Sequence, residues 1–214
     1  MDVIKVDLRG DYSEAIAHAV RVLSYGGTVV YPTDTVYGIG ANALEEIAIK
    51  KVFNVKQRPF AKPLPMFVRN MRWAEELVYI NPTNKRILEK IWPGKVTAVL
   101  PKREIIPDIL TAGEATVGLR ICSLKFINDL LKAFGYPLVS TSANISGEEA
   151  TRDPEDIMAV FERAAVQPSL IIDAGVLPPS DPSTVLDLTG SEPKILRVGP
   201  SRPDELLKLL DIKG

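Results

Sequence analysis

Two basic side chains near the end of a predicted helix have the types and spacing to bind a phosphate chain. Lys56 and Arg58 lie in the segment 50–72, which holds seven basic residues and no Asp or Glu. Pro59 favours an extended conformation at Arg58, and residues two apart in an extended segment project to the same side. An ammonium beside a forked guanidinium would suit a polyphosphate. The alternative, a solvated helix face, fits the basic residues that begin the segment.

A second alternation follows a predicted strand, at Ser140, Ser142 and Asn144. In an extended segment the three side chains share one side, and their small neighbours would let a ligand approach closely. Hydroxyl and amide groups there could bind phosphate, ribose or carboxylate. Taken alone, the run fits a helix cap or a turn better.

Composition excludes several familiar kinds of site. The chain has one cysteine, Cys122, and one histidine, His18, so a Cys/His zinc site and a disulfide framework are both ruled out. The position of His18 opposite an apolar stripe predicts a surface side chain, and Cys122 ends an apolar strand as a small buried residue. Gly38-Ile-Gly40 resembles a dinucleotide fingerprint, but the acidic residue expected about 20 positions later is missing. We therefore interpret these glycines as a tight turn.

Helices and strands must alternate to position the candidate residues. Apolar periodicity predicts helices over 13–25 and 42–55, and others beginning at Asn81, Ser123 and Asp153, with a last short one at Ser201. Strands are predicted at 28–31, 64–68, 96–100, 117–121, 138–139, 169–173, 184–188 and 195–198, with Pro65 placing 64–68 at an edge or a bulge. The predicted class is α/β with a mixed sheet flanked by helices.

Length and charge set further limits. The 214 residues, 46% of them hydrophobic, predict a single domain over 1–214 with its core at about 13–200. The net charge of −1 excludes a uniformly basic surface but allows a local basic patch. The sequence has no apolar run of transmembrane length and no signal-peptide pattern at its start, which predicts a cytoplasmic protein without membrane contact.

Together these segments closely resemble the YrdC family of L-threonylcarbamoyladenylate synthases, from about residue 13 to 200. The resemblance rests on several motifs in order: Tyr31-Pro-Thr-Asp-Thr-Val-Tyr-Gly-Ile-Gly40, Lys56-Gln-Arg-Pro59 with Lys62-Pro-Leu64, Trp92-Pro-Gly94, Thr116-Val-Gly-Leu-Arg120, Ser140-Thr-Ser-Ala-Asn-Ile-Ser-Gly147, Pro182-Ser-Thr184 and Ile195-Leu-Arg197.

The resemblance implies a twisted mixed sheet around a large, concave, positively charged cavity. It also implies synthesis of threonylcarbamoyl-AMP from L-threonine, bicarbonate and ATP, with release of pyrophosphate. A separate transferase would then modify tRNA beside the anticodon. Some family members carry a further C-terminal domain, and this chain, which stops 17 residues after Arg197, resembles the short form.

The family motifs also imply roles for individual residues. Lys56, Arg58, Ser142 and Asn144 match the catalytic group around the nucleotide. Thr33, Arg120, Ser140 and Ser183 match positions associated with threonine, and Thr116 and Arg197 match positions near ATP. Phe67 departs from the family, because some members have a histidine at that place.

Phosphoryl-group chemistry of this kind depends on positioning and charge neutralisation, and it needs neither histidine nor cysteine. We expect no organic cofactor and no protein metal site, with Mg²⁺ held through the ATP phosphates. The proline-rich stretch 176–184 could order over bound ligand as a lid, or serve as a rigid connector.

Two rival functions remain. A non-catalytic RNA-binding module would explain the basic segment, and weak RNA binding could also accompany an enzyme. A carbamoyl-adenylate-forming enzyme is the nearer rival, since hydrogenase-maturation carbamoyltransferases contain a YrdC-like module. Those proteins also carry zinc-finger regions, which a chain with one cysteine cannot supply.

Overall fold

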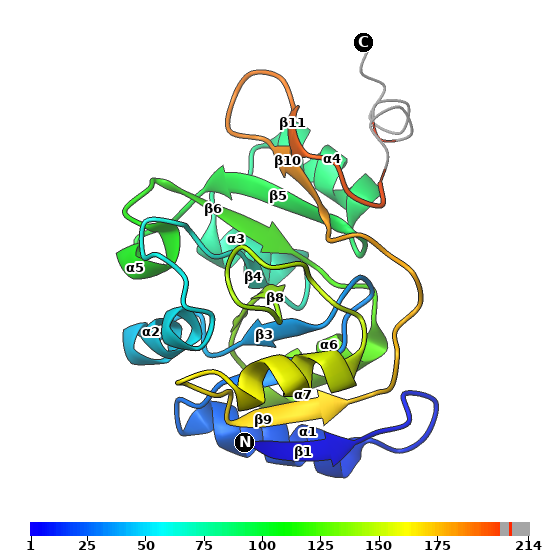
Figure 1. The fold of residues 1–214 in the computed structure, drawn as a ribbon. Helices are drawn as coiled ribbons and strands as arrows, with labels where there is room; N and C mark the ends of the chain where they lie inside the picture. The colour runs from blue at the N-terminus through cyan, green and yellow to red at the C-terminus, as the bar shows by residue number, and fades with distance from the viewer. Residues whose placement is uncertain (202–205, 207–214) are drawn as a thin grey trace.

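The strands form two mixed sheets in the computed structural model, which describes residues 1–201 and 206 (Figure 1). The five-stranded sheet, in the lower half of the view, runs in the order β1 (Asp2–Lys5), β9 (Leu170–Asp173), β2 (Val29–Tyr31), β3 (Gly38–Gly40) and β8 (Thr141–Ser142). The six-stranded sheet runs β11 (Lys194–Arg197), β10 (Thr184–Asp187), β5 (Val96–Pro101), β6 (Thr116–Arg120), β4 (Met66–Phe67) and β7 (Leu138–Val139). The predicted mixed α/β class is confirmed, but its strands divide between two sheets.

Seven helices connect these strands within the described residues: α1 (Ser13–Ser24), α2 (Glu46–Val55), α3 (Met71–Leu77), α4 (Pro82–Ile91), α5 (Asp108–Thr111), α6 (Lys125–Phe134) and α7 (Pro154–Glu162). In that part of the chain, no helix is long and apolar enough to cross a bilayer. The short helix expected after Ser201 lies outside the described residues.

Both faces of the five-stranded sheet are buried along its central strands, which alternate their side chains between two layers. Val29 and Tyr31 of β2 pack with α1 and α6, whereas Val30 packs in the larger core that includes α2 and α7. Strand β9 repeats this pattern, with Leu170 on the first side and Ile171 on the second. The sheet is therefore a rigid support for the loops at its ends.

Two predictions about the strands are wrong. Strand β4 lies between β6 and β7, because Pro65 precedes the paired residues and its carbonyl accepts from Ser140 N at 2.8 Å. Gly38 and Gly40 belong to strand β3 rather than to a tight turn. A Cβ atom at Gly40 would lie 2.1 Å from the carbonyl oxygen of Val139, so this glycine permits close packing between strands.

The helix ends are only partly as predicted. Asn81 and Asp153 cap α4 and α7, and Gly135 ends α6 at φ 82°. Asn42 and Ser123 do not cap helices. Asn42 accepts from Leu44 N at 3.0 Å in a preceding turn, and the Ser123 hydroxyl donates to another loop. The structure adds β1, α3 and α5, which the pattern did not predict.

Candidate active site

A cavity of about 480 Å³ lies between the two sheets. One side is built by β3 and the loop before it, and the other by β5, β6, β10 and β11. Eight of the ten predicted site residues line it: Thr33, Arg58, Thr116, Arg120, Ser140, Ser142, Ser183 and Arg197. The structure thus gathers these side chains in one place, and their roles remain predictions. Lys56 and Asn144 lie behind the cavity wall, and His18 does not line it.

Lys56 is a buried side chain that makes structural hydrogen bonds, and it does not face the cavity. It is 1% exposed, and its ammonium group donates to the carbonyl of Ser142 and to the carbonyl and side-chain oxygens of Asn144, the latter two at 2.8 and 3.1 Å. Burial of the amine and the nearby Arg58 guanidinium lower the pKa of Lys56 to about 7. Lys56 therefore holds the segment after β8 in place.

The prediction that Lys56 and Arg58 project to the same side is wrong. Lys56 ends α2 with helical dihedral angles, and Gln57 has a φ of 49°, so the segment is not extended. Pro59 constrains only the residue before it, and Lys56 is two positions too early for that effect. The left-handed residue instead turns Arg58 toward the cavity.

Arg58 is fixed by backbone groups that follow it. Its Nε donates to the carbonyl of Lys62 at 3.1 Å, and one terminal nitrogen donates to the carbonyl of Pro63 at 2.9 Å. Burial lowers the pKa of Arg58, but a guanidinium stays charged. Its remaining N–H groups can meet an anion in the cavity.

The serine-rich segment presents one hydroxyl from β8, at Ser142, and one from Ser140, which links β7 to β8. Ser140 and Ser142 both line the cavity, whereas Asn144 turns away. The Asn144 amide donates to the carbonyls of Ile145 and Glu148 at 3.0 and 2.7 Å, and Ser142 Oγ donates to its oxygen at 2.6 Å. Asn144 thus serves a turn, and the two serines face the ligand space.

The loop after β2 carries two further hydroxyls. Thr33 and Thr35 line the cavity, with their Oγ1 atoms 3.0 Å apart. Thr33 Oγ1 donates to the carbonyl of Val36 at 2.6 Å and accepts from Thr35 N at 3.0 Å. These bonds within the loop fix the direction of both hydroxyls.

Arg120, at the end of β6, is the most buried charge in the wall at 4% exposed. Its Nε donates to the carbonyl of Gly94 at 2.8 Å, and its guanidinium carbon lies 5.6 Å from the centroid of the Phe67 ring. A terminal nitrogen forms an ion pair with Asp34. Phe67 therefore supplies an aromatic face to the guanidinium.

Sequence reasoning missed Asp34. It is the only acidic residue between Glu14 and Glu45, in a stretch rich in apolar and small residues. Such an isolated carboxylate in a segment that must be buried needs a basic partner, and this signal could have identified it. Cys122 is buried as predicted, and its thiol lies 3.0 Å from Asp34 Oδ1.

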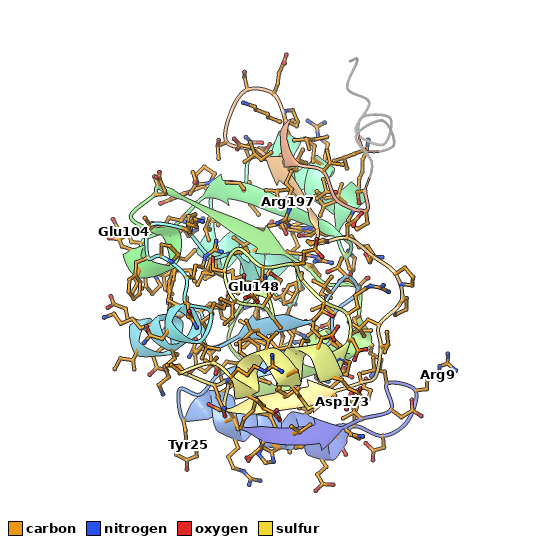
Figure 2. All side chains as sticks on the ribbon, viewed as in Figure 1. Arg9, Tyr25, Glu104, Glu148, Asp173 and Arg197 are labelled. Atoms are coloured by element: carbon orange, nitrogen blue, oxygen red, sulfur yellow. The ribbon has the colours of Figure 1, made fainter. Side chains whose placement is uncertain are left out.

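The opposite edge of the cavity is formed where β10 and β11 meet (Figure 2 labels Arg197 in the upper sheet). Arg197 donates to the carbonyl of Ser183 at 2.6 and 3.1 Å, and Ser183 Oγ lies 2.9 Å from Thr97 Oγ1. Burial and the neighbouring Arg120 lower the pKa of Arg197. Two guanidinium groups thus face one space, an arrangement that favours an anion.

Carboxylate ligands are sparse among the described residues of this cavity. Over residues 1–201 and 206, no group of three or more His, Cys, Asp or Glu side chains could hold a metal ion. Of the residues that the structure describes, Glu114 is the one carboxylate residue that lines the cavity, and it is exposed. These donors do not fit a protein-held Mg²⁺ site.

Comparison with known proteins gives consistent matches. A family profile described as "Telomere recombination" (Sua5_yciO_yrdC) matches residues 21–199. The threonylcarbamoyl-AMP synthase of Pyrococcus abyssi is 37% identical over 193 residues, which are 90% of this chain and 56% of that protein. The chain thus spans little more than half the length of that relative.

Solved structures agree with this fold. The crystal structure of P. abyssi Sua5 complexed with L-threonine superposes with a TM-score of 0.91 at 33% identity, covering 98% of this chain and 61% of that one. Escherichia coli YciO, a protein of similar length, superposes with a TM-score of 0.81 at 30% identity, covering 92% of this chain and 94% of that one.

Proposed function

The chain belongs to the Sua5/YciO/YrdC family, and from that premise we propose that it makes L-threonylcarbamoyladenylate from L-threonine, bicarbonate and ATP, releasing pyrophosphate. The P. abyssi relative is named a threonylcarbamoyl-AMP synthase, and P. abyssi Sua5 was crystallised with L-threonine. E. coli YciO is named only as an uncharacterised protein, so the activity of this chain needs its own test.

The observation that carries the proposal is the combination of guanidinium and hydroxyl groups in one cavity. Arg58, Arg120 and Arg197 all line it, Asp34 pairs with Arg120 from outside the cavity, and among the described residues Glu114 is the one carboxylate residue in its lining. ATP and the carboxylate of threonine are both anionic, so one cavity can neutralise both. Hydroxyls of the wall can meet the amine and hydroxyl of the amino acid.

The proposed reaction has two steps. Bicarbonate takes up a proton and loses water to give carbon dioxide, and the threonine nitrogen bonds to its carbon and loses a proton to solvent, giving a carbamate. A carbamate oxygen then bonds to the α-phosphorus of ATP, while the bond from that phosphorus to the bridging oxygen of the β-phosphate breaks. Pyrophosphate leaves with the electron pair and its negative charge.

The protein's contribution is to position and neutralise the reactants. Arg120 would hold the threonine carboxylate near Thr33, Ser140 and Ser183, with Arg58 and Arg197 facing the phosphates. Thr116 would lie near the nucleotide. Lys56 and Asn144 would act indirectly, by fixing the segment that carries Ser142.

Mg²⁺ would reach the cavity bound to the ATP phosphates, and no step above depends on a protein-held metal ion. We also propose that the product passes to a separate tRNA threonylcarbamoyl transferase. A carbamoyl adenylate is a mixed anhydride, so it suits transfer of its acyl group to an amine. Weak contact with RNA is also part of this proposal.

The test is a reconstitution of the reaction with purified protein. Pyrophosphate release should require ATP, bicarbonate and L-threonine together, and omission of any one should reduce it to background. Salt-dependent RNA binding without pyrophosphate release would favour the RNA-binding module instead.

A further inference from the structure

The carboxylate of Asp34 contacts three other residues, all distant from it in the sequence. Its carboxylate is paired with Arg120, accepts from Ser123 N at 3.0 Å and Ser123 Oγ at 2.6 Å, and lies 3.0 Å from the thiol of Cys122. The side chains of Asp34 and Arg120 are 8% and 5% exposed. The carboxylate thus connects the loop after β2, the end of β6 and the residues before α6.

Asp34 stays ionised in this environment. Burial alone would raise the pKa of Asp34, but the charge of Arg120 and the hydrogen bonds from Ser123 and Cys122 outweigh it, and the pKa lies below its usual value. Breaking such a buried pair leaves an uncompensated charge, so the pair holds its geometry strongly.

The ion pair between Asp34 and Arg120 lies next to residues that line the cavity. Its neighbours Thr33 and Thr35 line the cavity, whereas Asp34 does not. Arg120 has its Nε committed to Gly94 and one terminal nitrogen to Asp34, and Thr35 Oγ1 lies 3.4 Å from the other terminal nitrogen. These contacts use three of the five N–H groups of the guanidinium, and Arg120, which lines the cavity, keeps two for a ligand.

We propose that Asp34 is the positioning residue of the amino-acid subsite, fixing Arg120 for a substrate carboxylate and holding Thr33 at a set distance from it. This inference rests on the proposed function, because it takes L-threonine as the ligand. Asp34 does not touch the substrate and acts through Arg120.

The test compares L-threonine with L-threoninamide, which lacks the carboxylate. A charge-assisted contact with Arg120 should make wild-type protein prefer threonine by about 10- to 100-fold in Kd, measured by calorimetry. In Asp34→Asn the affinity for threonine should fall by about 10-fold with threoninamide unchanged, so the preference collapses. A general loosening of the cavity would weaken both ligands alike.

Two further variants make the test decisive. Ser123→Ala removes one hydrogen bond from Asp34 at an exposed position, and it should shift the preference in the same direction by a smaller factor, even if Asp34→Asn does not fold. Asp129→Asn is the matched control, since Asp129 pairs with Lys125 on the surface of α6 and does not line the cavity. It should keep the wild-type preference.

The outcomes separate the two proposals. If wild-type protein binds threonine, and the folded Asp34→Asn and Ser123→Ala proteins keep its preference, then the role of Asp34 is overturned and the proposed function stands. If Asp34→Asn does not fold, an unchanged preference in Ser123→Ala overturns it in the same way. Wild-type protein that binds no threonine would overturn the proposed function, and this subsite with it.

Discussion

The ammonium group of Lys56 lies 2.8 Å from the carbonyl oxygen of Asn144, a residue 88 positions later in the chain. This contact joins the end of α2 to the turn after β8 and leaves Lys56 with no direct access to the cavity. Lys56 therefore supports the candidate site from behind. Burial also disfavours the charged form of Lys56, so the free energy of unfolding should depend on pH.

Stability should depend on pH through Lys56. Its pKa is about 7 in the folded protein, against about 10.4 in an unfolded chain. Between these values the unfolded state binds more protons, so the free energy of unfolding should rise with pH. We expect the wild-type value minus that of Lys56→Met to increase from about pH 7 to 10, measured by urea denaturation. A flat or falling difference would contradict this assignment.

Arg58 should matter for the reaction more than for the fold. Its side chain faces the cavity and is held only by two backbone carbonyls. Arg58→Ala should reduce threonylcarbamoyl-AMP synthesis by about 10²-fold, because a charge contact to the phosphates is lost. We expect a similar loss for Lys56→Ala through the displaced Ser142. Arg72→Ala is the control, since Arg72 pairs with Glu76 and does not line the cavity. Near-normal turnover in both site variants would remove them from the mechanism.

The choice of amino acid should reflect the hydroxyls in the wall. Threonine should be preferred to serine only modestly, since one methyl group contributes about 1–3 kcal/mol. Valine should be rejected more strongly, because the partners of the threonine hydroxyl would be left unpaired. Relative kcat/KM values for the three amino acids test this. Faster turnover of valine than of serine would contradict the assignment of the subsite.

How far the sequence predicts the structure depends on whether a signal is local. Asn81 and Asp153 begin helices as expected, because each cap involves only a few neighbouring residues. Ser123 does not begin a helix as expected, because its hydroxyl donates to Asp34, 89 positions earlier. No local pattern records a contact across that separation.

The candidate site shows the same division. Motif resemblance selected ten residues, eight of which line one cavity. The predicted orientation of Lys56 is wrong, because Gln57 adopts a left-handed conformation. Glycine commonly adopts that conformation and glutamine rarely does, so the sequence gives no sign of it. Asp34 was missed because its importance comes from Arg120, which is distant in sequence and adjacent only in the folded chain.

The segment 176–184 should slow its hydrogen exchange when ATP and threonine are both bound. It is fastened at one end by paired bonds between Leu177 and Arg152, and at the other by Thr184 N to the carbonyl of Lys95, each at 3.0 Å. Between these points the Lys95 ammonium reaches Ser180 Oγ at 3.3 Å. A proline-rich segment that is held at both ends loses little conformational entropy when it orders over bound ligand.

Arg197→Ala tests the same segment, 176–184, at the end where Arg197 bonds to it. Arg197 donates to the Ser183 carbonyl, so removing the Arg197 side chain should loosen the segment 176–184. It should also weaken ATP binding by about 10-fold, as measured by calorimetry. If exchange is unchanged on saturation and the ATP affinity of the variant equals that of wild type, the segment is a rigid connector.

The most direct measurement of the central claim follows the carbon of bicarbonate. Purified protein is incubated with ATP, L-threonine and ¹³C-labelled bicarbonate, and the nucleotide products are identified by mass spectrometry. The account predicts threonylcarbamoyl-AMP that carries the label, formed in equal amount to pyrophosphate and strongly reduced in Arg58→Ala. Pyrophosphate without a labelled adenylate, or no turnover when all three substrates are present, would contradict it.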